Sequence, residues 1–290
     1  MIKKYEDLRY TDDFMFGKVM RVPSICKAVL ELLLEVPIER IEYVETQKTL
    51  DVSSRSKGVR LDAYVKGSEG TLYNVEMQAA RKWNLQKRSR YYQGVLDMSQ
   101  LEKGMDYETL PQSFIIFLCA FDLFGKGRCR YTFVNTCKED PDVCLEDGTA
   151  KVFVNATCER DGLSEEMCNF LDYVCGMEPR DELTAQIEQI VIQARSNEKW
   201  RAEYMKLEAD RMDWKREGHA EGFTEGREEG FTEGREEGFT EGRAEGRTEG
   251  SLETAQKLYA LFQTNALTEE RFAEVMKEAA QSRTFSEAEV

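Results

Sequence analysis

Two carboxylates inside strand-like segments are the residues of this sequence best suited to chemistry. Asp62 lies in the largely apolar segment 58–65, and Glu76 lies in the segment 72–78. A carboxylate in a buried strand needs a compensating partner, because burying an unpaired charge is costly. A hard divalent cation such as Mg2+ or Mn2+ would provide it, since these ions take oxygen ligands from one or two carboxylates and are completed by water and phosphate. The pair therefore indicates metal-dependent hydrolysis of phosphodiester bonds.

The spacing of these residues predicts that they meet in space. Residues 66–70 contain glycine and predict a hairpin turn, which would place Asp62 and Glu76 nearly opposite one another on paired strands. Gln78 follows Glu76 by two positions and therefore points to the same face of its strand. We predict Asp62, Glu76 and Gln78 as catalytic residues, with Asp62 and Glu76 as the metal ligands.

A basic segment follows the predicted site, and it contains no acidic residue between Glu76 and Asp97. Its position predicts binding of substrate phosphate. The residues that we assign to this role are Lys87, Arg88, Arg90 and Tyr91. The more ordinary alternatives are a solvated helix face for this segment, and ion pairs of Asp62 with Arg60 and of Glu76 with Arg81.

The arrangement of Asp62, Glu76-x-Gln78 and the basic-aromatic run 87–92 resembles the PD-(D/E)XK nuclease family transposases, the Rpn-like recombination-promoting nucleases. The resemblance implies a restriction-endonuclease-like core and a metal-dependent DNA endonuclease linked to recombination, mobile elements or defence. One departure from the broader superfamily is Gln78 in the position of its lysine, as is usual in this branch. Glutamine carries no positive charge, so Lys87 or Arg88 could supply the charge instead.

A second hypothesis comes from a different functional class. The chain would be a catalytically weak or inactive nuclease-fold protein that binds nucleic acid or protein and oligomerises through its C-terminal repeat. Gln78 in place of the lysine is the feature that keeps this alternative open.

The elements around these residues predict an α/β fold. Apolar periodicity predicts one or two helices before Pro37, strands in 38–50, 59–65 and 72–77, a helix in 84–103 and a buried strand in 113–124. Further strands are expected in 131–137 and 151–156, and helices in 164–177 and 183–215. This order predicts a restriction-endonuclease-like mixed sheet flanked by helices, followed by a long helical region.

Three domains are expected: a nuclease-like domain in 1–180, a helical region in 181–250 and a small helical unit in 251–290 with helices in 254–262 and 268–280. Glycine occupies every fourth position from 218 to 250, in a Glu-Gly-Phe/Arg repeat. Nine glycines weaken a lone helix by about 1 kcal/mol each relative to alanine. Self-association through the glycine stripe, a helical spacer and a solvated tail all remain open.

Charge is divided unevenly along the chain. The net charge is -15, but residues 1–110 carry a net +1 and the remaining residues a net -16. A nucleic-acid partner for the first part is therefore compatible with the acidic total. No apolar run is long enough to span a bilayer and the start is unlike a signal peptide, so we expect a cytoplasmic protein with DNA as partner and no membrane contact.

Overall fold

The structure is a computed structural model that describes residues 3–50, 59–81, 84–263, 268–275 and 277. Contacts divide the chain into two compact units, Met1–Ala209 and Asp210–Val290. The domain boundaries near residues 180 and 250 that we expected from the sequence stay predictions.

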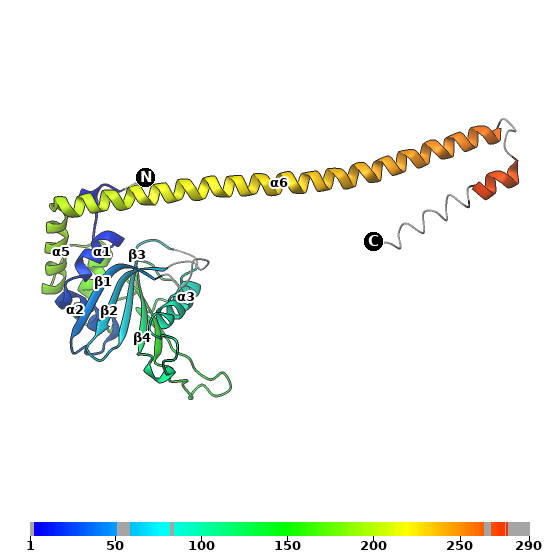
Figure 1. Cartoon of the computed structure of the whole chain (residues 1–290). Coiled ribbons are helices and arrows are strands. Elements are labelled where there is room, and N and C mark those ends of the chain that lie inside the picture. The colour runs from blue at the N-terminus through cyan, green and yellow to red at the C-terminus, as the bar shows by residue number, and fades with distance from the viewer. Residues whose placement is uncertain (1–2, 51–58, 82–83, 264–267, 276, 278–290) are drawn as a thin grey trace. The chain divides into compact units, whose positions relative to one another are not determined.

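A six-stranded mixed sheet forms the centre of the first unit, in the order β1-β2-β3-β4-β6-β5 (Figure 1). The first three strands form the predicted antiparallel meander, β3, β4 and β6 run parallel, and β5 pairs antiparallel to β6 at the edge. The strands are β1 (Ile41–Leu50), β2 (Val59–Gly67), β3 (Leu72–Gln78), β4 (Ser113–Cys119), β5 (Arg130–Phe133) and β6 (Thr149–Asn155).

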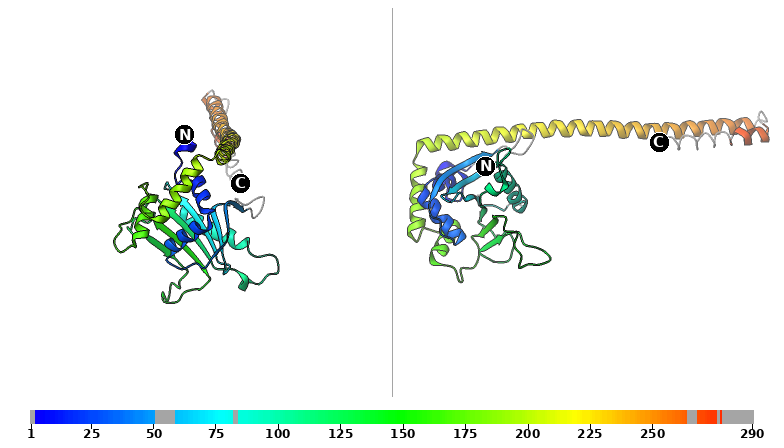
Figure 2. Two further views of the ribbon diagram at one scale, coloured as in Figure 1. Left: turned by 90° about the vertical axis from the view of Figure 1, so that its left-hand side faces the viewer. Right: turned by 60° about the horizontal axis from the view of Figure 1, so that its bottom comes forward.

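Helices cover both faces of this sheet. Helix α3 (Leu85–Met98) connects the parallel strands β3 and β4 and packs on one face, whereas α1, α2, α4 and α5 pack on the other (Figures 1 and 2). Their bounds are α1 (Asp13–Met20), α2 (Pro23–Leu34), α4 (Glu165–Val174) and α5 (Glu182–Arg195), and short 3-10 turns lie at Tyr5–Asp7 and Tyr107–Thr109. The predicted fold class, a mixed sheet flanked by helices and followed by a long helical region, is confirmed.

The two faces of β3 have different chemistry. Val75 and Met77 point into the larger apolar core, which contains side chains of α1, α2, α4 and α5. Leu72 belongs to the smaller core under α3. Because strand residues alternate between faces, the polar residues at even positions of β3 lie on the α3 side.

Some predicted elements end earlier than expected. The helix predicted for 84–103 ends at Met98, and the strand predicted for 113–124 ends at Cys119. Beyond the end of the strand, the carboxylate of Asp122 accepts the backbone N–H groups of Phe124 at 3.0 Å and Gly127 at 2.8 Å, which holds this segment in a loop. The strands predicted for 131–137 and 151–156 are β5 and β6, and β5 is shorter than expected.

The helix predicted for 183–215 is two helices. Helix α5 ends at Arg195, and α6 (Glu198–Gln263) begins after Asn197, whose side chain accepts the backbone N–H of Trp200 at 3.1 Å. The first turns of α6 belong to the first unit, where Tyr204 is buried against Tyr5 and Phe14. The apolar pattern of 183–215 is continuous, but Asn197 caps the start of a new helix within it, so the segment forms two helices.

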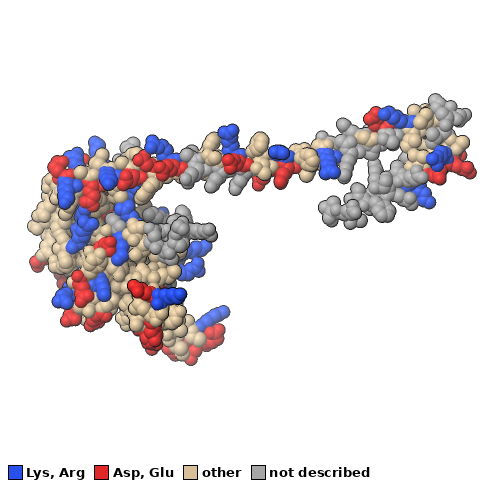
Figure 3. All heavy atoms as spheres, in the orientation of Figure 1, with Lys and Arg blue, Asp and Glu red and all other residues tan. Residues whose placement is uncertain are grey.

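The second unit contains the rest of α6. The glycine repeat is helical, and the helix expected for 254–262 is the end of α6 rather than a separate element. Residues 269–275 are again helical, and the remainder of the expected last helix lies outside the described residues except for Lys277. Acidic and basic side chains both occur along α6 (Figure 3). None of the helices in the described part of the chain combines the length and the apolar character that crossing a membrane requires.

Candidate active site

At Asp62 and Glu76, side-chain hydrogen bonds replace the regular backbone pairing of β2 with β3. The regular register ends at Ala63 and Val75. Beyond it, the backbone N–H of Asp62 donates to Glu76 Oε1 at 3.1 Å, and the backbone N–H of Met77 donates to Asp62 Oδ2 at 3.2 Å. Each side-chain carboxylate thus accepts an N–H group of the opposite strand, so the structure brings Asp62 and Glu76 together.

Glu76 is buried, with 1 % of its surface exposed. Burial raises the pKa of the Glu76 carboxyl well above its usual range, and the neighbouring charge of Asp62 raises it further. The Asp62 N–H group and the Arg88 guanidinium oppose this shift without cancelling it. A second positive charge beside Glu76 would stabilise its ionised form.

Arg88 reaches this pair from α3. Its guanidinium donates to Glu76 Oε2 at 3.2 Å, to Gln78 Oε1 at 3.3 Å and to the Tyr92 hydroxyl oxygen at 2.7 Å. It also lies over the Tyr92 ring, 5.1 Å from the centroid. One arginine therefore connects the strand that carries Glu76 and Gln78 to the helix behind it.

Tyr92 is a member of this cluster that sequence reasoning did not assign. Burial, followed by the charge of Glu76, raises the pKa of Tyr92 to about 12, so its hydroxyl stays protonated at neutral pH. Its spacing of four residues from Arg88 is the signal that could have revealed it, because helix positions i and i+4 share a face. Sequence reasoning also did not assign Asn74, which is fully buried on β3. Its spacing of two residues from Glu76 is the signal here, because strand residues two apart share a face.

The other predicted phosphate-binding residues lie apart from the cluster. Lys87, Arg90 and Tyr91 are exposed on α3, whereas Arg88 is partly buried and faces the sheet. The structure thus brings together Asp62, Glu76, Gln78 and Arg88, and leaves the remaining three on the outer surface of the helix. Glu76 forms an ion pair with Arg88 at 3.2 Å. The sequence had suggested Arg81 as a possible partner of Glu76.

The oxygen atoms of this cluster fit a hard divalent cation. Asp62 and Glu76 provide two carboxylates, and Gln78 provides an amide oxygen. Across the residues that the structure describes, no group of three or more His, Cys, Asp or Glu side chains forms a metal-binding arrangement. Mg2+ matches a site of this kind, because it is bound through one or two carboxylates and keeps several waters.

The mixed sheet flanked by helices is consistent with a restriction-endonuclease-like architecture. The family model of the PD-(D/E)XK nuclease family transposases matches residues 13–138, a stretch that includes every residue of the cluster. The family resemblance predicted from the sequence is confirmed over these residues. No curated protein and no solved structure matches the chain significantly.

Proposed function

We propose that this protein is a divalent-metal-dependent DNA endonuclease, acting in recombination, in mobile-element biology or in defence. The observation that carries the proposal is the pair of Asp62 and Glu76, joined by reciprocal hydrogen bonds at 3.1 and 3.2 Å where the ladder between β2 and β3 ends. The match to the transposase family supports DNA as the substrate. Mg2+ at phosphate-processing sites is bound through one or two carboxylates together with substrate phosphate, and a metal held this way can promote hydrolysis.

Asp62 and Glu76 would hold Mg2+ or Mn2+. When bound, such an ion activates water and stabilises charge on the scissile phosphate. Gln78 lies beside Glu76 and its amide can orient water or a phosphate oxygen. Arg88 would supply the positive charge that Gln78 lacks, because its guanidinium already lies 3.3 Å from the Gln78 oxygen.

The outer face of α3 would contact the rest of the substrate. Lys87 and Arg90 are exposed one turn apart and would bind backbone phosphates, with Tyr91 beside them. Contacts of this kind position a duplex without reading its sequence. They also make binding sensitive to salt, since each neutralised phosphate releases counterions.

Cleavage of plasmid and linear DNA with Mg2+ or Mn2+ tests this function. We expect cleavage by the wild-type protein that stops with a chelator, and background levels for Asp62→Asn and Glu76→Gln, because each change removes a negative metal ligand. Glu42→Gln, on the exposed edge of β1, is the matched control and should cleave normally. Full activity of both site variants would rule out the assigned ligands.

The second candidate function, a weakly active or inactive protein that binds nucleic acid, is favoured by the Arg88 contact. Arg88 already provides Glu76 with a cation at 3.2 Å, so the buried carboxylate has a partner without a metal. In the same assays this function would appear as salt-sensitive DNA binding with no turnover in either metal. Calorimetry would then show equal binding of Mn2+ by the wild type and by Asp62→Asn.

A further inference from the structure

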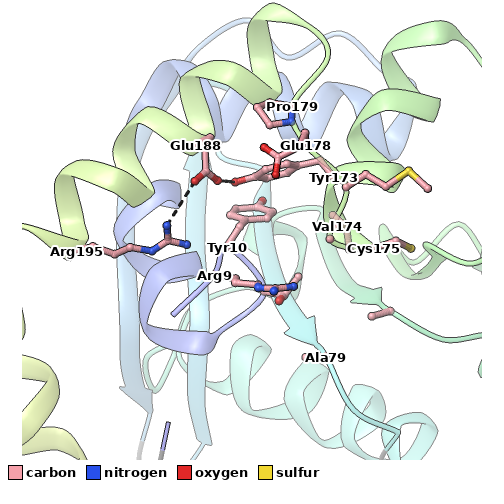
Figure 4. Close-up of a pocket in the computed structure, with 14 residues that line it drawn as sticks. Arg9, Tyr10, Ala79, Tyr173, Val174, Cys175, Glu178, Pro179, Glu188 and Arg195 are labelled. Carbon is pink, nitrogen blue, oxygen red and sulfur yellow. Dashed lines mark hydrogen bonds and ion pairs between the residues drawn. The ribbon is translucent and has the colours of Figure 1, made fainter. Parts of the chain in front are cut away.

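A pocket of about 370 Å³ lies beyond the carboxyl ends of the parallel strands β3 and β4. Ala79 and Ala120, the residues that follow these strands, contribute to its lining (Figure 4). The walls come from the segment before α1 and from α4, α5 and their connection. Ligands of open α/β sheets bind outside the carboxyl ends of strands, and the volume is sufficient for a small molecule.

Arg9 provides a positive charge at one side of this pocket. Within the described part of the chain, its guanidinium makes no hydrogen bond and no ion pair, although its backbone N–H donates to Asp12. Gly176 makes room for it: this residue has a φ of +96°, and a Cβ atom there would lie 3.2 Å from Arg9 Nη1. An arginine without a protein partner beside a pocket can bind an anion through two parallel hydrogen bonds.

The opposite side of the pocket carries carboxylates. Glu188 accepts a hydrogen bond from the Tyr173 hydroxyl at 2.7 Å and lies 3.6 Å from Arg195 Nη1. Arg195 is held in turn by the backbone oxygen of Leu8 at 2.9 Å. Figure 4 shows Glu188 and Glu178 on this side, away from Arg9. The charge of Arg195 is thus compensated by Glu188, whereas Arg9 has no such partner in the described residues.

Tyr10 lies between these two sides. Its side chain is buried, and its hydroxyl has no hydrogen-bond partner in the described residues. A buried hydroxyl without a partner costs free energy that a polar ligand atom would recover. The pocket therefore has the guanidinium of Arg9 at one end, the Glu188–Arg195 ion pair with Glu178 at the other, and the Tyr10 hydroxyl between them.

We propose that this pocket binds a nucleoside monophosphate unit, with its phosphate on Arg9 and the N–H groups of its base towards Glu188 and Glu178. This ligand carries an anionic group at one end and hydrogen-bond donors at the other, which matches the polarity of the pocket. The choice of a nucleotide over other phosphate monoesters rests on the proposed function. Ala79 of the pocket directly follows Gln78 of the candidate nuclease site, so a nucleotide of the DNA substrate is a ligand available beside this pocket. The unit is either a free mononucleotide or the terminal nucleotide of a DNA strand.

Calorimetry with the full chain in the presence of a chelator tests the pocket. We expect dAMP to bind the wild type, and Arg9→Ala to weaken its affinity by roughly 10-fold or more, as for loss of a charged hydrogen bond. Arg40→Ala is the matched control, because Arg40 is an exposed arginine before β1, and it should bind dAMP as the wild type does. Absence of binding at millimolar dAMP, or equal affinity in Arg9→Ala, would overturn the proposal.

Fragments of the ligand test its identity. Inorganic phosphate and 2-deoxyribose 5-phosphate should bind at least about 10-fold more weakly than dAMP, because they lack the base. Equal affinity for either fragment would overturn the nucleotide assignment. A trinucleotide with a 5′-phosphate distinguishes the two sources of the ligand. Tighter binding of the trinucleotide than of dAMP identifies a strand terminus, and weaker binding identifies the free nucleotide. In either case Arg9→Ala must weaken binding of the preferred ligand.

The pocket and the proposed nuclease site can fail independently. Asp62→Asn should abolish DNA cleavage but keep the affinity for dAMP, because Asp62 does not line the pocket. Loss of dAMP binding in Asp62→Asn would assign the nucleotide to the carboxylate site and overturn the pocket. Normal dAMP binding by a protein that never cleaves DNA would overturn only the proposed function.

Discussion

At the scale of single residues, Glu76 is both a predicted metal ligand and a buried carboxylate with a raised pKa. Its carboxylate is almost completely buried beside Asp62, and Arg88 is the cation that contacts it at 3.2 Å. A single arginine shared among Glu76, Gln78 and Tyr92 only partly compensates this burial, because the pKa of Glu76 stays raised. The uncompensated part of the cost of burying the ionised Glu76 carboxylate would be reduced by an additional cation at this site.

The raised pKa of Glu76 leads to a prediction for stability against pH. The folded state disfavours ionised Glu76, so the wild type loses stability as the pH rises from the usual glutamate range through the raised folded pKa. Glu76→Gln does not titrate, and its stability relative to the wild type should increase from pH 5 to pH 8. Urea unfolding in the presence of a chelator measures this difference, and a difference independent of pH would contradict the pKa shift.

The same two proteins provide a control for metal binding. Adding Mg2+ at pH 8 should stabilise the wild type by about 2.7 kcal/mol at one hundred times the Kd, because the ion binds only the folded state. Glu76→Gln should gain much less, since it has lost one of the two carboxylate ligands.

At the scale of elements, the start of α6 is attached to α1 through a buried lysine. Lys18 is 4 % exposed, and its ammonium donates to both carboxylate oxygens of Glu203 at 2.8 and 2.7 Å. The rings of Phe14 and Trp200 lie 4.8 and 5.0 Å from the same ammonium. This contact holds the first turns of α6 against the nuclease-like unit.

This contact predicts an asymmetry between two substitutions. Glu203→Gln leaves the buried ammonium of Lys18 without its carboxylate, and should lower the free energy of unfolding by about 1–3 kcal/mol. Lys18→Met removes the charge and keeps the aliphatic volume, so we expect a loss below about 1 kcal/mol. Urea unfolding measures both, with the exposed Glu217→Gln on α6 as the control. A larger loss in Lys18→Met than in Glu203→Gln would contradict this account.

At the scale of the whole molecule, two units of different composition share one chain. The first unit contains the sheet and the candidate sites, and the second consists largely of the helical glycine repeat. Phe223, Phe231 and Phe239 of this repeat are exposed by 67–71 %. A Cβ atom added at any described glycine of the repeat would meet no atom within 4 Å beyond the adjacent backbone of its own helix, so another helix can approach these glycines closely.

Self-association through the glycine repeat stays a prediction from the sequence, and a pair of substitutions tests it. Gly230→Ala together with Gly234→Ala should increase helicity, because alanine favours a helix by about 1 kcal/mol per residue over glycine. The same pair should weaken association, because the added methyl groups prevent close approach. Circular dichroism and light scattering measure the two effects, and Thr232→Ala on the same helix is the control. Association that persists in the double variant would exclude the glycine stripe as the contact.

Local features of this protein could be predicted from the amino-acid sequence alone. Short-range alternation and a glycine-containing turn were enough to predict the β2–β3 hairpin and the approach of Asp62 to Glu76, and the order of the helices and strands predicted the mixed sheet. These features follow from neighbours in the chain, because a hairpin of this length has only one register that buries its apolar face. The family resemblance was visible in the same segment.

Which side chains of α3 enter the site, and where a second pocket forms, depends instead on the tertiary structure. The burial of Leu85 and Leu96 under the sheet sets the rotation of α3, which turns Arg88 and Tyr92 inward and leaves Lys87 and Arg90 outside. The second pocket needs segments more than 160 residues apart, since Arg9 lies directly beside Gly176 in its lining. Packing between elements distant in the chain determines both arrangements, and local spacing shows which residues of α3 share a face but not which face packs on the sheet.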